Sequence, residues 1–427
     1  MKQTFQRAKD ASNAMPVQKT NRDTTWNIDA NDQTWTLATN AKITVENQNG
    51  IDESGFSGSH IKVLGDVTVT GPGAYAIRLT GADSSVLIGR DSRINAGNAE
   101  AGILSEGDGA HIVNRGYIRS AEGGIGGNTW ADVDNYGTIK SNDTGIYFDG
   151  GGSQIHNHGN IQALDMGIFT EASGTYIENS KGAEISGGSF GIFVLGPGQS
   201  EIVNKGVLRA DGYAISGGHG EMSVTNTGRI IGRVSLGDGA DMIDTRKGTV
   251  RGEIEGGDGG DIYKISDAKT KIVEYAEGTG ADEVQSTVSY RLAANVETLT
   301  LIGRNDTNAT GTELGNTLTG NKGDNRISGM AGEDFLNGSR GDDILTGGAD
   351  ADVFIFNRAD DADVIRDFED GMDRLFIEGV YNQATFDELD IRQAKGDVSI
   401  DFGHGNEIRI EDMTKANFAF DDMIVLA

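Results

Sequence analysis

The chain has 427 residues, enough for several ordinary domains or for one long solenoid. Its net charge of −29 opposes binding to nucleic acid and to anionic membranes, and its lack of cysteine excludes a fold held by disulfides. With 64 glycines, only 3 prolines and 36% hydrophobic residues, the composition excludes collagen and favours many tight turns around a thin core.

The N-terminal residues 1–55 are expected to form a cap in which Trp26 and Trp35 pack. Residues 1–19 contain no apolar segment of the kind found in secretory signal peptides. The apolar clusters of the chain are too short to cross a bilayer, so we expect no transmembrane segment.

A first repeat runs from about Gly102 to Ile230, and each unit contains a Gly-Ile pair followed by Ile/Val-x-Asn-x-Gly-x-Ile. The asparagine of this unit recurs at Asn114, Asn135, Asn157, Asn179, Asn204 and Asn226. A period near 22 with β-branched alternation and Gly/Asn punctuation predicts three short strands per coil. We therefore expect a right-handed parallel β-helix over residues 56–235, with stacked isoleucines and asparagine amides bonded between coils.

A second repeat steps in nines from residue 311. Its first position is Gly311, Gly320, Gly329, Gly338 and Gly347; its sixth is Asn316, Asn325, Asp334, Asp343 and Asp352; its eighth is Leu318, Ile327, Leu336, Leu345 and Phe354. Two repeats make one 18-residue coil, so loops 18 residues apart should stack. We expect a parallel β-roll over residues 311–356, preceded by a seam and spacer at 236–310 and followed by a C-terminal cap at 357–427.

This pattern resembles the RTX family, whose nonapeptide is Gly-Gly-x-Gly-x-Asp-x-apolar-x. Two further copies stand in the seam, at residues 236–244 and 256–264, and the spacer near residues 288–303 is similar to RTX spacers. The resemblance covers roughly residues 236–427 and is specific over 311–356. It implies an all-β fold in which the β-helix continues into a calcium-binding β-roll.

The resemblance also implies the calcium ligands, which are the carbonyls of positions two and four and the side chain of position six. Calcium takes six to eight oxygen ligands, and glycine lets the loop backbone curl to present them. The ligand residues that follow are Gly237, Gly239, Asp241, Gly257, Gly259, Asp261, Asn321, Gly323, Asn325, Met330, Gly332, Asp334, Ser339, Gly341, Asp343, Gly348, Asp350 and Asp352.

The copies depart from the family pattern in two ways. Position four is Leu314 or Asp350 in the outer copies, which puts those loops in doubt, and Asn316 and Asn325 remove charge from position six. We therefore expect the strongest sites at Asp334, Asp343 and Asp352.

The excess of acidic residues in the repeat region should make its folding depend on calcium binding. Residues 309–373 hold 15 acids and 5 bases, so stacking of these loops should require bound cations. The upstream stack, with an aliphatic core and no aspartate series in its turns, should fold without metal.

The resemblance implies export by type I secretion machinery, which reads an uncleaved C-terminal signal. Residues 421–427, with acids before a short apolar tail, are similar to such a signal; alternatively they form a last buried strand. The expected location is extracellular or at a cell surface, where calcium is abundant.

Two functions remain open. The first is a non-enzymatic, adhesin-like protein or extracellular scaffold, with extracellular polysaccharide or a cell surface as partner. The second is a carbohydrate-active β-helix enzyme of the lyase or epimerase type, for which one coil offers His156, His158, Asp149 and Tyr147. If Asn157 points inward, both histidines point to solvent, and we favour the first function.

Overall fold

The computed structural model describes residues 15–424 apart from 172, 277, 279 and 359, and it is an all-β, right-handed parallel β-solenoid. The chain divides into an N-terminal unit, residues 1–192, and a C-terminal unit, residues 193–427. Among the described residues, no helix has the length and apolar character needed to cross a bilayer.

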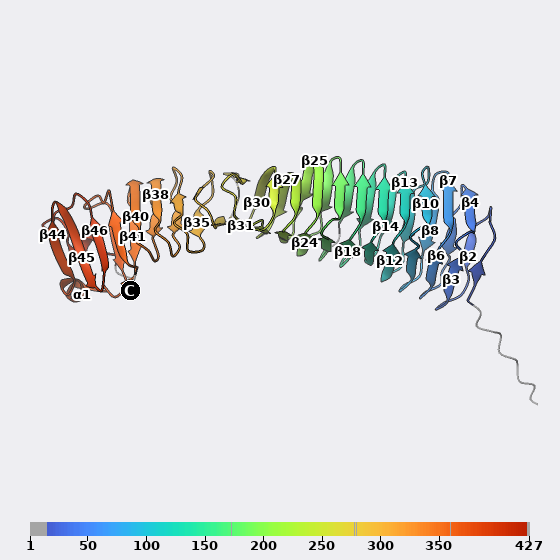
Figure 1. Ribbon diagram of the computed structural model, residues 1–427, viewed down its shortest axis with the longest axis horizontal. Helices are drawn as coiled ribbons and strands as arrows, with labels where there is room; N and C mark the ends of the chain where they lie inside the picture. The colour runs from blue at the N-terminus through green and yellow to red at the C-terminus, as the bar shows by residue number, and fades with distance from the viewer. Residues whose placement is uncertain (1–14, 172, 277, 279, 359, 425–427) are drawn as a thin grey trace, which may run out of the picture. The chain divides into compact units, whose positions relative to one another are not determined.

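The N-terminal unit is built from parallel strands of successive coils, which lie side by side in Figure 1. One sheet contains β1 (Val17–Gln18), β3 (Thr34–Leu37), β6 (His60–Val63), β9 (Ser85–Ile88), β12 (Ala110–Asn114), β15 (Ala131–Asn135), β18 (Gln154–Asn157) and β21 (Tyr176–Asn179). The other faces contain β2 (Trp26–Ile28), β4 (Lys42–Glu46), β5 (Ile51–Glu53), β7 (Asp66–Thr70), β8 (Tyr75–Leu79), β10 (Arg93–Ala96), β11 (Ala101–Ser105), β13 (Tyr117–Ser120), β14 (Gly123–Gly127), β16 (Thr138–Ser141), β17 (Thr144–Phe148), β19 (Asn160–Ala163), β20 (Met166–Thr170) and β22 (Glu184–Gly187).

Each coil of this unit carries three strands, as the 22-residue repeat predicts. In one coil these are β11, β12 and β13. The Gly-Ile pairs place one isoleucine above another through Ile103, Ile125, Ile146 and Ile168, all fully buried. This aliphatic stack removes apolar surface from water at every coil and needs no ion.

The repeated asparagines form a buried ladder at the ends of their strands. The amide of Asn114 donates to Asn135 Oδ1 at 2.8 Å, Asn135 donates to Asn157 at 2.8 Å, and Asn157 donates to Asn179 at 2.9 Å. An amide carries both a donor and an acceptor, so a stack of asparagines satisfies itself. The predicted bonding between coils is therefore confirmed.

The coils begin earlier than residue 56. Strands β2 and β4, in the segment for which the sequence predicts a cap, already pair in parallel with β5 and β7 of the next coil. Trp26 and Trp35 are both buried, and their rings meet edge to face at 6.0 Å. Residues 1–14 of the predicted cap lie outside the described residues.

The C-terminal unit begins with the same kind of coil and changes to shorter ones. After β23 (Phe190–Val194), which spans the division, one sheet contains β24 (Ser200–Asn204), β26 (Met222–Asn226), β28 (Met242–Asp244), β31 (Ile262–Ile265), β33 (Glu283–Ser286), β35 (Thr298–Leu301), β37 (Thr317–Thr319), β39 (Phe335–Asn337), β41 (Val353–Phe356) and β43 (Arg374–Ile377). A second contains β25 (Val207–Ser216), β27 (Arg229–Asp238), β29 (Thr249–Arg251), β30 (Glu253–Asp258) and β32 (Lys271–Val273). A third contains β34 (Tyr290–Arg291), β36 (Asn308–Thr310), β38 (Arg326–Ala331), β40 (Ile344–Ala349), β42 (Ala362–Ile365), β44 (Asp390–Ala394), β45 (Asp397–Gly403) and β46 (Asn406–Ile410).

The nine-residue repeats form the predicted two-sheet β-roll. Leu318, Leu336 and Phe354 stack in one sheet, in parallel register 18 residues apart. Ile327 and Leu345 stack in the opposite sheet, and all five side chains are buried. The eighth positions therefore form the core, as expected, and the two sheets leave the six-residue turns at the edges.

The roll is closed by an antiparallel element. Strands β44, β45 and β46 pair antiparallel to one another, and β46 pairs in parallel with β42. The short helix α1 (Gln383–Asp387) buries Phe386 against Phe418 and Phe420, and η1 (Phe420–Asp422) follows. Met423 bridges to Leu375, so the described part of the predicted secretion signal packs on the last coil; residues 425–427 lie outside the described residues.

The asparagine ladder yields a test that does not involve metal. Replacing Asn135 with alanine removes the buried hydrogen bonds that it makes with Asn114 and Asn157, so we expect a loss of about 2–4 kcal/mol in stability. All three tryptophans lie in the N-terminal unit, so urea unfolding followed by tryptophan fluorescence reports on it. The control is Gln162→Ala at an exposed position of β19. Equal midpoints for the two variants would contradict the ladder's role.

Candidate calcium sites

The turns of the β-roll stack on one another with an unusual backbone. In the turn 329–334, Met330 and Gly332 both have φ of 93°; in the next turn on the same edge, Gly348 has φ of 121° and Asp350 of 79°. Met330 pairs with Gly348 in parallel register. Positions two and four are thus left-handed even where they are not glycine.

The turn 338–343 repeats this conformation on the opposite edge, with φ of 72° at Ser339 and 108° at Gly341. Left-handed backbone is strained for a residue with a side chain, and it persists only where its surroundings enforce it. The three turns therefore share one geometry, and Asp350 at position four does not disturb it.

The position-six aspartates are buried and point along the stack. Asp334, Asp343 and Asp352 are at most 1% exposed. In each, Oδ1 accepts the backbone N–H of the residue 18 positions earlier: Asn316 to Asp334 at 2.6 Å, Asn325 to Asp343 at 2.7 Å, and Asp334 to Asp352 at 3.0 Å. One oxygen of every carboxylate thus holds neighbouring coils together.

The second oxygen of each carboxylate has no partner. Oδ2 of Asp334, Asp343 and Asp352 is buried and makes no hydrogen bond. It lies against the first glycine of its own turn: a Cβ added to Gly338 would meet Asp343 Oδ2 at 2.2 Å. Burying a carboxylate oxygen without a partner destabilises the fold. Such an oxygen is a suitable ligand for a hard cation such as calcium.

The raised pKa values of these carboxyl groups also show that burial disfavours their charged form. Burial raises the pKa of Asp334 to about 6, that of Asp352 to about 7 and that of Asp343 to about 8, although the backbone hydrogen bonds oppose the shift. Without a cation these carboxyls therefore favour a proton far more than ordinary aspartates do.

The turns with asparagine at position six are closed by the protein itself. Asn325 accepts the backbone N–H of Asn321 at 2.7 Å and donates to the carbonyl of Thr307 at 2.8 Å. Asn321 Oδ1 accepts the backbone N–H of Gly323 at 2.8 Å. Positive φ is found at neither Asn321 nor Gly323, so this predicted loop has a different conformation.

Asn316 behaves in the same way. Its amide donates to the carbonyl of Val296 at 3.0 Å, and its Oδ1 accepts from the backbone of Thr312 at 2.7 Å. Neither Thr312 nor Leu314 has positive φ. In the first turn on each edge of the roll, the asparagine amide therefore makes hydrogen bonds within the protein in place of binding an ion.

The two seam turns repeat the arrangement of the roll. Positive φ occurs at Gly237, Gly239, Gly257 and Gly259, and the two turns pair in register. The backbone N–H of Met222 donates to Asp241 Oδ1 at 2.6 Å and that of Asp241 donates to Asp261 Oδ1 at 2.8 Å. Oδ2 of Asp241 and of Asp261 is buried without a partner.

Four acidic residues that sequence reasoning missed extend this set. Asp282 accepts the backbone N–H of Asp261, Asp363 accepts that of Asp343, and Asp373 accepts that of Asp352. Glu274 lies beside Asp261 and Asp282. We call the aspartates that bond the preceding coil in this way the corner carboxylates: Asp241, Asp261, Asp282, Asp334, Asp343, Asp352, Asp363 and Asp373.

A signal for Asp282 was present in the sequence. Residues 277–282 read Glu-Gly-Thr-Gly-Ala-Asp, which matches the repeat at positions two, four and six, and Val284 fills position eight. Gly280 has φ of 103°, and an added Cβ there would strike Gly259 of the turn beneath. This third seam turn escaped notice because its spacing is 21 residues rather than 18 or 20.

The residues proposed for enzymatic chemistry are divided between two sheets of the coil. Asn157 is fully buried, His158 is exposed and His156 is half-buried on β18, as expected, whereas Tyr147 lies on β17 of a different sheet. His158 stacks on Tyr136 with ring centroids 4.6 Å apart. Burial raises the pKa of Tyr147 to about 12, which makes it a poor base at neutral pH.

The comparisons with known proteins agree with this geometry. The family model of the RTX calcium-binding nonapeptide repeat matches residues 310–345 and 332–362. The chain therefore carries RTX calcium-binding repeats in a parallel β-solenoid. The search of curated proteins gave no match.

One solved structure with similarity is the extracellular lipase LipA from Serratia marcescens. It is 17% identical, with a TM-score of 0.24, over 49% of this chain and 40% of the lipase. The match thus spans less than half of the lipase, and so low a TM-score supports no inference about activity.

A substitution at Asp343 distinguishes a role in calcium binding from a purely structural role. Asp343→Asn removes a costly buried carboxylate, so with chelator we expect equal or higher thermal stability. With calcium we expect a loss of about 1–3 kcal/mol, because a charged ligand is gone. Calorimetry in both conditions measures this crossover, with Asp387→Asn, at an exposed position of α1, as control. Equal destabilisation in both conditions would contradict ligation.

Proposed function

We propose that this chain is a secreted calcium-binding protein whose repeat region completes its folding on calcium outside the cell. The observation that carries the proposal is the row of buried carboxylate oxygens without partners at Asp241, Asp261, Asp334, Asp343 and Asp352. With a net charge of −29, the chain gains from neutralising cations, and calcium at extracellular concentration supplies them.

The proposed ligands are those that the repeat implies: the carbonyls of positions two and four and the carboxylate of position six. The turns of Met330, Ser339 and Gly348 carry the left-handed backbone that this ligation requires. Loop 320–325 has weaker support, because Asn325 is already hydrogen-bonded within the protein. The turn ending at Asp282 joins the set.

We also infer export by type I secretion, which the RTX repeats imply and which calcium-dependent folding would suit. At the low calcium concentration of the cytosol the acidic repeats stay loose, which suits passage through a channel, and at about millimolar calcium sites of this class fill. RTX repeat proteins are typically exported, and we infer that this chain is extracellular or attached to a cell surface.

We further propose a non-enzymatic role as an adhesin-like protein or scaffold, with extracellular polysaccharide or a cell surface as partner. Support comes from a polar aromatic row on the N-terminal unit: Arg115 lies 5.5 Å over the ring of Tyr136, which stacks on His158. Tyr136 is 50% exposed. Stacked aromatic and polar side chains of this kind suit sugars and polar surfaces.

Calcium titration tests the main proposal. Circular dichroism of chelated protein should show less β-structure than loaded protein, with a main midpoint at about 0.1–1 mM calcium. Magnesium at the same concentration should restore little of the signal, because it demands a smaller, octahedral site. Identical spectra in chelator and in calcium would sink the proposal.

One surface hollow supports the alternative function, a carbohydrate-active enzyme. It measures about 450 Å³ in the N-terminal unit and is lined by Asp66, Arg90, Asp91, Ser92, Arg93, Gly116 and Tyr117. Arginines beside carboxylates and a tyrosine are the groups that a uronate lyase or epimerase uses.

Incubation with alginate or pectin tests this alternative. We expect no unsaturated product in the ultraviolet and no change of uronate stereochemistry by NMR. Turnover that disappears in Tyr117→Phe would place a carbohydrate-active site in this hollow and overturn the non-enzymatic role.

A further inference from the structure

Glu274 occupies a place in the seam where the roll has glycine. Strand β32 pairs with β30 so that Val273 lies opposite Glu255, and the side chain of the next residue, Glu274, lies beside Gly256. In the roll the equivalent neighbours are both glycines: Gly329 packs against the carbonyl of Gly347. In the seam a carboxylate of the following coil thus lies beside the first glycine of the turn, and the last turn of the roll is similar, because the backbone N–H of Gly347 donates to Asp367 of the following coil.

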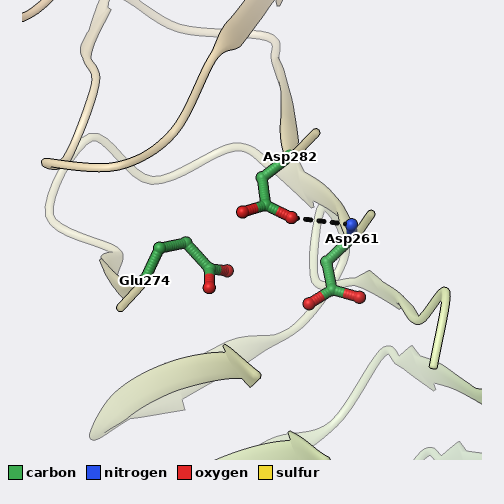
Figure 2. Close-up of side chains that lie close together, drawn as sticks. All are labelled: Asp261, Glu274 and Asp282. Atoms are coloured by element: carbon green, nitrogen blue, oxygen red, sulfur yellow. Dashed lines mark hydrogen bonds between the residues drawn. The ribbon is translucent and has the colours of Figure 1, made fainter. Parts of the chain in front are cut away.

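This carboxylate turns toward two corner carboxylates. Asp261, Glu274 and Asp282 are buried, and each offers an oxygen within 4.8 Å of the others (Figure 2). A Cβ built on Gly256 would lie 2.1 Å from Asp261 Oδ2 and 2.3 Å from Glu274 Oε1. Asp261 Oδ2 and Glu274 Oε1, which belong to different coils, therefore lie close to the same position.

The cluster is held from outside. The hydroxyl of Tyr263, a fully buried residue, donates to Glu274 Oε1, and the backbone N–H of Asp261 donates to Asp282 Oδ1 at 2.8 Å. Asn295 donates to the backbone carbonyl of Glu274 at 3.0 Å. These contacts fix the direction of each side chain before any ligand arrives.

One oxygen of the cluster lacks a partner. Asp261 is 0% exposed, and its Oδ2, which points at Glu274, makes no hydrogen bond. In the described part of the chain, no lysine or arginine forms an ion pair with any of the three carboxylates. Three carboxylates this close repel one another unless a cation or protons join them.

We propose that Asp261, Glu274 and Asp282 hold one calcium ion in a three-carboxylate site that fills at lower calcium than the turns of the roll. The proposal rests on the proposed function only in taking calcium as the ion. Ligand charge sets affinity in calcium sites, and this site has three carboxylates where a roll turn contributes one. The ion ties the spacer segment, residues 262–282, to the seam turn before it.

The test compares Glu274→Gln with Glu255→Gln in the full-length protein. Glutamine at 274 keeps the size of the side chain and an acceptor for Tyr263 but loses the charge. Glu255 is one residue from Gly256 on β30 and half-buried, so its variant makes the same charge change outside the cluster. Isothermal titration into chelated protein measures the number and strength of calcium sites.

We expect wild type and Glu255→Gln to show a tight class of sites that fills before the main class. In Glu274→Gln one ion of the tight class should be lost or bind at least about tenfold more weakly, with the main class unchanged. Unchanged tight binding in Glu274→Gln overturns this inference and leaves the proposed function standing. Absence of calcium binding in all three proteins overturns both.

Terbium luminescence locates the ion independently of stability. Terbium takes calcium sites and is excited through a neighbouring phenol, and Tyr263 touches the cluster. Excitation of tyrosine at substoichiometric terbium should give a signal that Tyr263→Phe and Glu274→Gln remove. Tyr290→Phe is the matched control, since its hydroxyl bonds the carbonyl of Thr270 outside the cluster. A signal that survives in Tyr263→Phe places the tight ion elsewhere and refutes the assignment.

Discussion

The seam and the roll of the C-terminal unit depend on one kind of interaction, the buried carboxylate that hydrogen-bonds the coil before it. One oxygen of each corner carboxylate accepts a backbone N–H, which fixes the stacking of successive coils. The other oxygen is buried without a partner at five of these positions. The same residue thus provides register between coils and creates the need for a cation, so that fold and metal binding are linked through a single side chain.

The bends between strands are held by different polar side chains in the two parts of the solenoid. In the N-terminal unit the bends are held by asparagines, whose amides donate to one another along the stack. At the corner before the strands of this unit, serine takes the place of aspartate: Ser153 accepts the backbone N–H of Ala131. Neutral groups that both donate and accept need no ion, whereas a carboxylate cannot donate. This difference explains how one backbone architecture gives a metal-free part and a calcium-dependent part.

Much of this could be predicted because repetition makes the sequence signal strong. The nine-residue register placed Leu336, Leu345 and Phe354 in the core, and the 22-residue register placed the asparagine ladder; both are confirmed. The sequence failed where the period changes. Asp282, Asp363 and Asp373 follow the preceding corner carboxylates by 20 or 21 residues, because the chain between them is longer than in the roll. Glu274 could not be found at all, since its alignment with Gly256 depends on strand pairing inside an irregular spacer.

Hydrogen–deuterium exchange, resolved along the chain by mass spectrometry, tests the central claim most directly. With saturating calcium, the amides that donate to the corner carboxylates, such as those of Asn316, Asn325 and Asp334, should exchange slowly. In chelator they should exchange many times faster, while residues 60–190 remain equally protected in both conditions. Equal protection of the C-terminal unit with and without calcium would contradict the account.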